Sequence, residues 1–164
     1  MTGRVSRRDL FTSLTKYGLG AVAASGLRIP EVLAHNGGGH AVSRTDSVTT
    51  LSTSFVDIPG MSIPEEFQRP NSLLVVLFSA EVLTSMSPDG RMDIRALDGP
   101  TVLEPPTANI ITREGDIQAH GFNFYRLDAP VGNRIIRMQW RLSSSAGFAR
   151  MDNRSMIVLL TAVP

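Results

Sequence analysis

The feature that most constrains this chain is a two-residue alternation of apolar and polar side chains. It is clearest over residues 134–142, and one face of that segment holds four large apolar residues: Ile136, Met138, Trp140 and Leu142. The other face holds Ile135, Arg137, Gln139 and Arg141. Successive side chains of a β-strand point to opposite faces of a sheet, so the segment predicts a strand with one buried face.

Similar segments recur roughly every dozen residues, with turn residues between them. We expect strands over residues 51–58, 72–83, 91–97, 108–112, 117–127, 134–142, 148–151 and 155–163. Turns are expected at Pro59-Gly60, at Asp98-Gly99-Pro100 and over 128–133. No helical period is present after residue 34. The pattern therefore predicts an all-β fold, an antiparallel β-sandwich.

Two of the expected strands are apolar on both faces. Residues 72–83 (SLLVVLFSAEVL) and 155–163 (SMIVLLTAV) are nearly continuous apolar runs, which is typical of strands covered on both sides. One sandwich has a single inner face, so the second faces need another cover. A homo-oligomer would supply it, a trimer before a dimer, and a loop over residues 100–112 folded back onto the sheet is the alternative.

The first 34 residues resemble a twin-arginine export signal. Arg7 and Arg8 are followed by one free position and then by Leu10 and Phe11, and a short apolar run covers residues 17–27. That run is about half the length of a transmembrane helix, so no permanent membrane span is expected. Residues 32–34 (VLA) match a signal-peptidase site, and cleavage is expected after Ala34.

This resemblance sets the expected organisation and location. Residues 1–34 are the signal peptide, 35–46 a flexible Gly-rich leader and 47–164 the β-sandwich domain. The twin-arginine translocase would be the partner during export, and the mature protein would be periplasmic or extracellular.

Charge and composition exclude several classes of function. Residues 35–164 carry 11 basic and 13 acidic side chains, an unsuitable balance for a protein that neutralises many phosphates of a nucleic acid. The chain has no cysteine, which excludes thiol nucleophiles, thiolate metal sites and disulfides. No phosphate-binding loop, dinucleotide fingerprint or G-x-S-x-G elbow is present. We predict no catalytic constellation and no cofactor.

Several short segments resemble a small β-sandwich domain of phage tail and tail-fibre proteins. Those domains typically show an "sFvDvpg" opening, an "f.flDsPa" corner, a "y.vqwr" strand and an "iNRS" turn before the closing strand. The matching segments, together with the apolar strand 73–78, lie at residues 53–63, 124–130, 138–141 and 152–155. They span most of the chain from residue 51 to residue 163.

The resemblance implies a jelly-roll-like sandwich, similar to tumour-necrosis-factor and C1q-type folds, which tend to form trimers. The sequence departs from the pattern over residues 100–112, where the family has a glycine-rich segment, and at its end, where the family has an acidic terminus. A twin-arginine signal is also foreign to phage structural proteins, so the tail-fibre role is not carried over.

Histidine offers the one alternative chemistry. Cleavage after Ala34 would leave His35 with a free α-amino group, and an N-terminal histidine can chelate copper with a second histidine, either His40 or His120. Three successive glycines after His35 argue against the rigid terminus that such a brace needs. His120 shares parity with Phe122 and Phe124, which predicts a place near the core with a hydrogen-bond partner.

The charged residues have ordinary structural interpretations. Glu65-Glu66 is expected in a solvated loop, and Asp89, Asp98 and Asp128 are expected to form turns. The outward arginines of two strands are expected to pair with carboxylates, or to form a patch for acidic glycans: Arg91, Arg95, Arg137 and Arg141.

The leading hypothesis is thus an exported, non-enzymatic β-sandwich that self-associates or binds a surface ligand. A copper-dependent oxidative enzyme and a glycan-binding lectin-like module are the alternatives.

Overall fold

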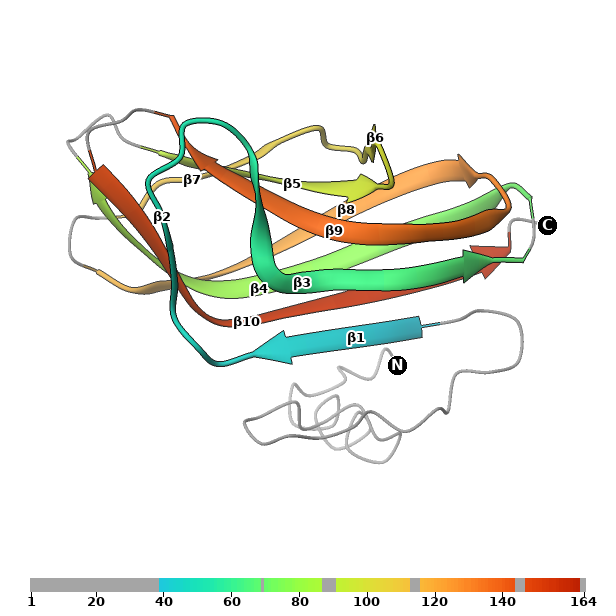
Figure 1. The fold of residues 1–164 in the computed structure, drawn as a ribbon, viewed down its shortest axis with the longest axis horizontal. Helices are drawn as coiled ribbons and strands as arrows, with labels where there is room; N and C mark the ends of the chain where they lie inside the picture. The colour runs from blue at the N-terminus through green and yellow to red at the C-terminus, as the bar shows by residue number, and fades with distance from the viewer. Residues whose placement is uncertain (1–38, 69, 87–90, 113–115, 144–146, 163–164) are drawn as a thin grey trace, which may run out of the picture. The chain divides into compact units, whose positions relative to one another are not determined.

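A computed structural model describes residues 39–68, 70–86, 91–112, 116–143 and 147–162. The chain divides into two units, Met1–Glu31 and Val32–Pro164, and the described residues all belong to the second. They form ten strands (Figure 1): β1 (Gly39–Arg44), β2 (Val48–Thr50), β3 (Val56–Phe67), β4 (Ser72–Met86), β5 (Met92–Asp98), β6 (Thr101–Val102), β7 (Ala108–Ile110), β8 (Gln118–Ala129), β9 (Gly132–Leu142) and β10 (Gly147–Ala162).

Two antiparallel sheets contain these strands. Sheet A has the order β1-β10-β4-β8, and β2 pairs with the other half of β10. Sheet B has the order β3-β9-β5-β6, and β7 also pairs with β5. If β1 and β2 count as one interrupted strand, and β6 and β7 as another, each sheet has four strands. The first strand pairs with the last, and the chain crosses repeatedly between the sheets, which is the jelly-roll topology.

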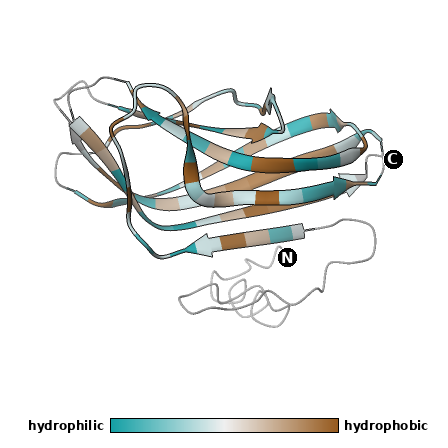
Figure 2. Ribbon diagram, viewed as in Figure 1, coloured by the Kyte–Doolittle hydropathy of each residue, from teal (hydrophilic) through white to brown (hydrophobic). Residues whose placement is uncertain are grey.

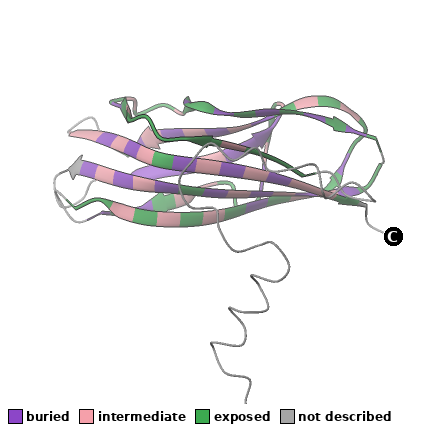
Figure 3. Ribbon diagram, turned by 90° about the horizontal axis from the view of Figure 1, so that it is seen from below, coloured by how far each residue is buried: buried purple, intermediate pink, exposed green. Residues whose placement is uncertain are grey.

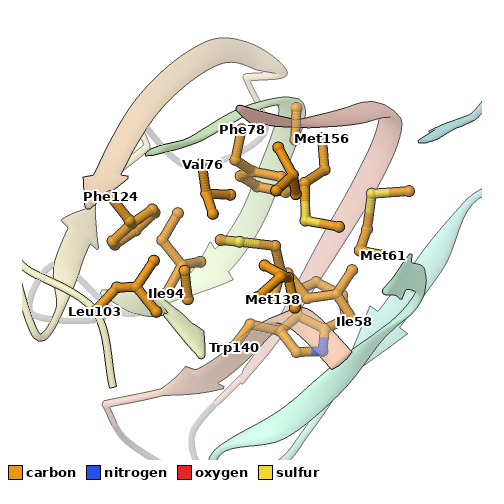
Figure 4. Close-up of a cluster of buried hydrophobic side chains, with 14 of the residues drawn as sticks. Ile58, Met61, Val76, Phe78, Ile94, Leu103, Phe124, Met138, Trp140 and Met156 are labelled. Atoms are coloured by element: carbon orange, nitrogen blue, oxygen red, sulfur yellow. The ribbon is translucent and has the colours of Figure 1, made fainter. Parts of the chain in front are cut away.

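The core lies between the two sheets. Side chains from both layers meet there (Figure 4), among them Phe78 and Met156 from sheet A and Met138 and Trp140 from sheet B. Buried residues alternate with more exposed ones along the long strands (Figure 3), and β9 buries Ile136, Met138, Trp140 and Leu142. The fold class and the parity predicted from the alternation are confirmed.

The expected turn at Pro59-Gly60 is wrong. Strand β3 continues through these residues, and its register against β9 shifts between Asp57 and Ser62. Gly60 has a φ of 73°, which an L side chain rarely adopts. A β-bulge uses the same residue types as a turn, so Pro-Gly in the sequence does not distinguish a bulge from a strand end.

The two strands expected over 148–151 and 155–163 are one strand. Strand β10 runs through both segments, and its register against β4 shifts between Asp152 and Ser155. Asn153, at this shift, has a φ of 35°. Asn tolerates left-handed backbone, so the residues that indicated a turn form a second bulge.

The flexible leader is expected to reach residue 46, but its second part is ordered. Gly39–Arg44 forms β1 and pairs with β10 over residues 154–159. Backbone hydrogen bonds to an existing strand offset the entropy that glycine loses on ordering. Residues 35–38 lie outside the described part of the chain.

The loop over residues 100–112 does not fold back over sheet A. Its strands β6 and β7 pair with β5 and extend sheet B. Glu104 reaches the edge of sheet A, where its backbone exchanges hydrogen bonds with Tyr125 of β8. The second faces of β4 and β10 therefore receive no cover from this segment.

Candidate functional site

The outer face of sheet A carries an apolar patch, which we call the apolar face. It is built from side chains that alternate with the buried ones on β4, β10 and β8: Leu73, Val75, Leu77, Ile157, Leu159, Tyr125 and Leu127. The register places Leu159, Val75 and Tyr125 side by side across three strands. Leu127 is 60% exposed and Tyr125 46%.

Polar residues border the apolar face on the same sheet. Ser79 and Ser155 are joined by a hydrogen bond of 2.8 Å, and the Asn153 amide donates to Glu81 at 2.7 Å. None of the seven residues of the apolar face is charged. An apolar centre with a polar border is typical of protein interfaces.

The outer face of sheet B has the opposite character and is here called the arginine face. Its strands β5 and β9 carry Arg95, Arg137 and Arg141, with Arg91 just before β5. The alternation of apolar and polar residues along these strands is visible in Figure 2. Arg141 and Arg91 approach the buried Asp93 at 3.0 and 3.4 Å. Arg137 lies 3.7 Å from Asp57, so the expected pairing with carboxylates is confirmed for these three arginines.

Arg95 has a different environment, without a carboxylate among its partners in the described residues. Its Nε and Nη2 donate to the neutral Gln139 amide oxygen at 2.9 and 2.7 Å. Its guanidinium lies 3.9 Å from the centre of the Phe55 ring, and that of Arg141 lies 4.5 Å from the same ring. Burial lowers the pKa of Arg95, and the positive charges of Arg141 and Arg137 lower it further.

The edge between β1 and β3 carries a polar contact between the sheets. His40 Nδ1 of β1 lies 2.8 Å from Glu65 Oε1 of β3. Glu65 is buried, contrary to the loop expected at Glu65-Glu66, and burial raises its pKa while His40 opposes the shift. These two residues line an open groove of about 380 Å³ with Pro64, Glu66, Asn133, Arg134 and Ile135.

A second buried carboxylate, Asp98, lies at the end of β5. The turn expected at Asp98-Gly99-Pro100 is confirmed, since Asp98 pairs with Thr101 across it. The Asp98 side chain is also completely buried, and its Oδ2 accepts from Arg126 at 2.5 Å and from Arg134 at 2.9 Å. Arg134 is the register partner of Glu65, yet its guanidinium contacts Asp98. The cluster joins β5, β8 and β9.

Arg154 joins the two bulges and the break in the edge strand. Its side chain is 1% exposed, and it donates to the Pro59 carbonyl at 3.0 and 3.2 Å. It also donates to the Asp46 carbonyl and carboxylate, between β1 and β2. In the sequence, Arg154 is part of the segment 152–155 that resembles the turn before the closing strand of the phage tail domains, and this resemblance predicts no structural role for it.

The two candidate histidine ligands lie far apart. His40 is on β1 and His120 on β8, at opposite edges of sheet A with β10 and β4 between them. His40 and His120 are alternatives for the second ligand beside His35, and because His35 lies outside the described residues the copper brace stays a prediction. His120 is half-buried and stacks on Phe122, as a place near the core requires, but its buried Nε2 has no hydrogen-bond partner among the described residues. The described residues contain no group of three metal-ligating side chains.

The proposed export residues Arg7, Arg8, Leu10, Phe11 and Ala34, with His35 and Asp89, lie outside the described residues. Asp128 has a φ of 56° next to the register shift between β4 and β8, consistent with its expected place at a corner. The described residues contain no helix that could cross a membrane.

Sequence reasoning missed the buried charges Glu65, Asp98 and Arg154. For Glu65 a signal was present, since Met61, Ile63, Glu65 and Phe67 keep one parity and all are buried. Pro64 and the turn expected at Pro59-Gly60 both favour a loop, so the alternation over these residues does not by itself predict a strand.

The strand order defines a jelly-roll β-sandwich. No protein-family model matches the sequence, and no curated protein matches it.

Similar solved structures include that of the infectious bursal disease virus Gx strain, with 15% identity and a TM-score of 0.47 over 84% of this chain and 36% of that one. The VP2 subviral particle of the same virus matches with 13% identity and a TM-score of 0.40, over 87% and 42%. A family two carbohydrate esterase from Cellvibrio japonicus matches with 12% identity and a TM-score of 0.29, over 78% and 36%. This chain thus spans about two fifths of their length or less.

Proposed function

We propose that the protein is an exported, non-enzymatic structural module that self-associates through its apolar face. The observation that carries the proposal is the outer face of sheet A, where the central strands β4 and β10 present Val75, Leu77, Ile157 and Leu159. Covering this face would remove apolar surface from water, at roughly 25 cal/mol per Å² buried.

A second copy of the chain is the occupant that the charges favour. The apolar face holds no charged residue, so packing it on itself brings no like charges together. The arginine face cannot pack on itself in this way, because four guanidinium groups would meet four others. The resemblance to trimeric folds makes a homotrimer the expected stoichiometry, with the three apolar faces directed towards the three-fold axis. Packing of one apolar face on one other would give a dimer, the next expectation.

Sedimentation equilibrium of the purified protein tests the proposal. We expect an oligomer at micromolar concentration, and we expect Val75→Lys and Ile157→Lys to give monomers because each places an ammonium group in the interface. Ile135→Lys is the matched control, since Ile135 is an outward aliphatic residue of sheet B and is 54% exposed. This variant should remain oligomeric.

Two results would overturn the proposal. One is a wild-type protein that stays monomeric throughout the micromolar range. The other is an oligomer that both sheet A variants leave intact while their urea unfolding midpoints match that of the wild type.

A further inference from the structure

We propose that the arginine face binds an acidic polysaccharide, whose carboxylate or sulfate groups pair with Arg95, Arg137 and Arg141. This proposal goes beyond self-association and does not depend on it, because the arginine and apolar faces belong to different sheets. The argument rests on incompletely balanced charge, on preorganised guanidinium groups and on the shape of a sheet surface.

The arginine face has more positive charge than its own carboxylates balance. Four arginines share Asp57 and Asp93, which leaves a formal charge of +2 in this cluster, and of +1 when the exposed Glu66 further along β3 is included. Arg137 makes only long contacts, 3.7 Å from Nε to Asp57 and 3.5 Å from Nη2 to the Gly99 carbonyl. Arg95 is hydrogen-bonded only to the neutral Gln139 among the described residues. Anionic groups would relieve the mutual repulsion of these cations.

The guanidinium groups are held in place before any ligand arrives. Arg95 is fixed by two hydrogen bonds to Gln139, whose amide in turn donates to Asp57 at 2.7 Å. Arg95 and Arg141 also lie over the Phe55 ring, a favourable cation–π arrangement. Ordering these long side chains in advance lowers the entropy cost of binding.

The distribution of charge favours a polysaccharide over a nucleic acid. Carboxylates are interspersed with the arginines, and Asp57 is more than half exposed. A duplex carries one phosphate per about 1.7 Å of axis and would meet these carboxylates at close range. Residues 35–164 also carry more acidic than basic side chains. An acidic polysaccharide combines wider charge spacing with hydroxyl groups that accept from arginine and donate to Asp57 and Gln139.

Binding to immobilised polymers tests the proposal. The purified protein is passed over heparin, which presents sulfates and carboxylates, over polygalacturonate, which presents carboxylates alone, and over uncharged dextran. We expect binding to at least one polyanion at about 50 mM salt that weakens towards about 200 mM, and none to dextran. The better polyanion identifies the preferred acidic group.

Single substitutions locate the site. Arg95→Gln and Arg137→Gln should each weaken binding about fivefold, while Arg150→Gln should leave it unchanged. Arg150→Gln is the matched control because it removes the same charge from β10 of sheet A, away from the arginine face. Phe55→Leu keeps every charge, so as a positioning residue Phe55 should change the affinity without changing the salt dependence.

Three results would overturn the proposal. The first is no binding to either polyanion at low salt. The second is an equal loss of affinity in Arg150→Gln and Arg95→Gln, which would mean that only net charge matters. The third is tighter binding to duplex DNA than to both polysaccharides, which would assign the face to nucleic acid.

Discussion

At the scale of single residues, three of the ionisable side chains that the described residues bury lie away from the arginine face: Glu65, Asp98 and Arg154. Each connects separate strands. Glu65 faces His40 across the edge between β1 and β3, Asp98 receives two arginines, and Arg154 contacts Pro59 and Asp46. Burial of a charge costs free energy unless hydrogen bonds and opposite charges compensate. The partners of each of these three side chains therefore decide whether it stabilises or destabilises the fold.

Glu65→Gln should stabilise the fold at neutral pH. Burial raises the pKa of Glu65 in the folded state, so the folded protein binds the proton more tightly than the unfolded chain does. The stability linked to this group is therefore present below the unfolded pKa and is lost as the pH rises through the folded pKa. We expect Gln to recover up to about 1 kcal/mol at pH 7, and nothing below pH ~4.

Urea unfolding followed by Trp140 fluorescence measures this difference at each pH. Glu66→Gln is the control, because this substitution removes the same charge from the next residue, whose side chain is exposed. If Glu65→Gln is less stable than the wild type at pH 7, the attraction to His40 outweighs the cost of burial.

Arg154→Met should destabilise the fold by about 2–3 kcal/mol. Methionine keeps much of the apolar stem but removes the donors to the Pro59 and Asp46 carbonyls. One acceptor at the β3 bulge and one at the break between β1 and β2 then lose these donors. Arg150→Met is the control, since the Arg150–Asp152 pair is partly exposed and should contribute less than about 1 kcal/mol. Equal unfolding free energies for the two variants would contradict a connecting role for Arg154.

At the scale of elements, regular strands were predictable and their irregularities were not. The alternation over 134–142 gave the correct buried face of β9, and the apolar run over 72–83 gave the central strand β4. Pro59-Gly60 and residues 152–154 predict strand ends but form bulges, because bulges and turns both use residues that tolerate positive φ. A bulge differs from a turn in that the strand goes on pairing with its neighbour beyond it, with β9 for β3 and with β4 for β10. This pairing joins residues far apart in the sequence.

The bulge in β3 gives a prediction of its own. Gly60→Ala should cost about 1–2 kcal/mol, because alanine is strained at a φ of 73° and its Cβ would lie 2.7 Å from Arg44 Nε. Gly121→Ala on β8 is the control, since its added Cβ would have no atom within 4 Å. Thermal unfolding of both variants checks the difference. A Gly60→Ala protein as stable as Gly121→Ala would show that β3 does not need a left-handed residue there.

At the scale of the whole molecule, the two sheets present different outer surfaces. The alternation of residues in the sequence predicts both surfaces. It places outward arginines on residues 91–97 and 134–142, and a second apolar face on residues 72–83 and 155–163. The sequence could not show which loop segments cover these faces. Residues 100–112 join sheet B and leave the apolar face open, while Phe55 approaches the arginine face from the segment before β3.

Both surface proposals require the protein to reach the compartment where its partners are, so the last prediction concerns export. Changing Arg7 and Arg8 together to Lys should leave a full-length precursor in the cytoplasm, because the signal that the sequence resembles is defined by its paired arginines. The β-sandwich begins more than 30 residues later, so the unfolding free energy of the retained protein should be unchanged.

Arg4→Lys is the matched control, since it makes the same substitution outside the pair and should allow normal processing. Immunoblots of cytoplasmic and exported fractions, with the mass of the mature N-terminus, measure the outcome. A terminus at His35 supports cleavage after Ala34. Normal processing of the double variant would contradict the twin-arginine assignment, and the location of both proposed surfaces would then have to be established independently of residues 1–34.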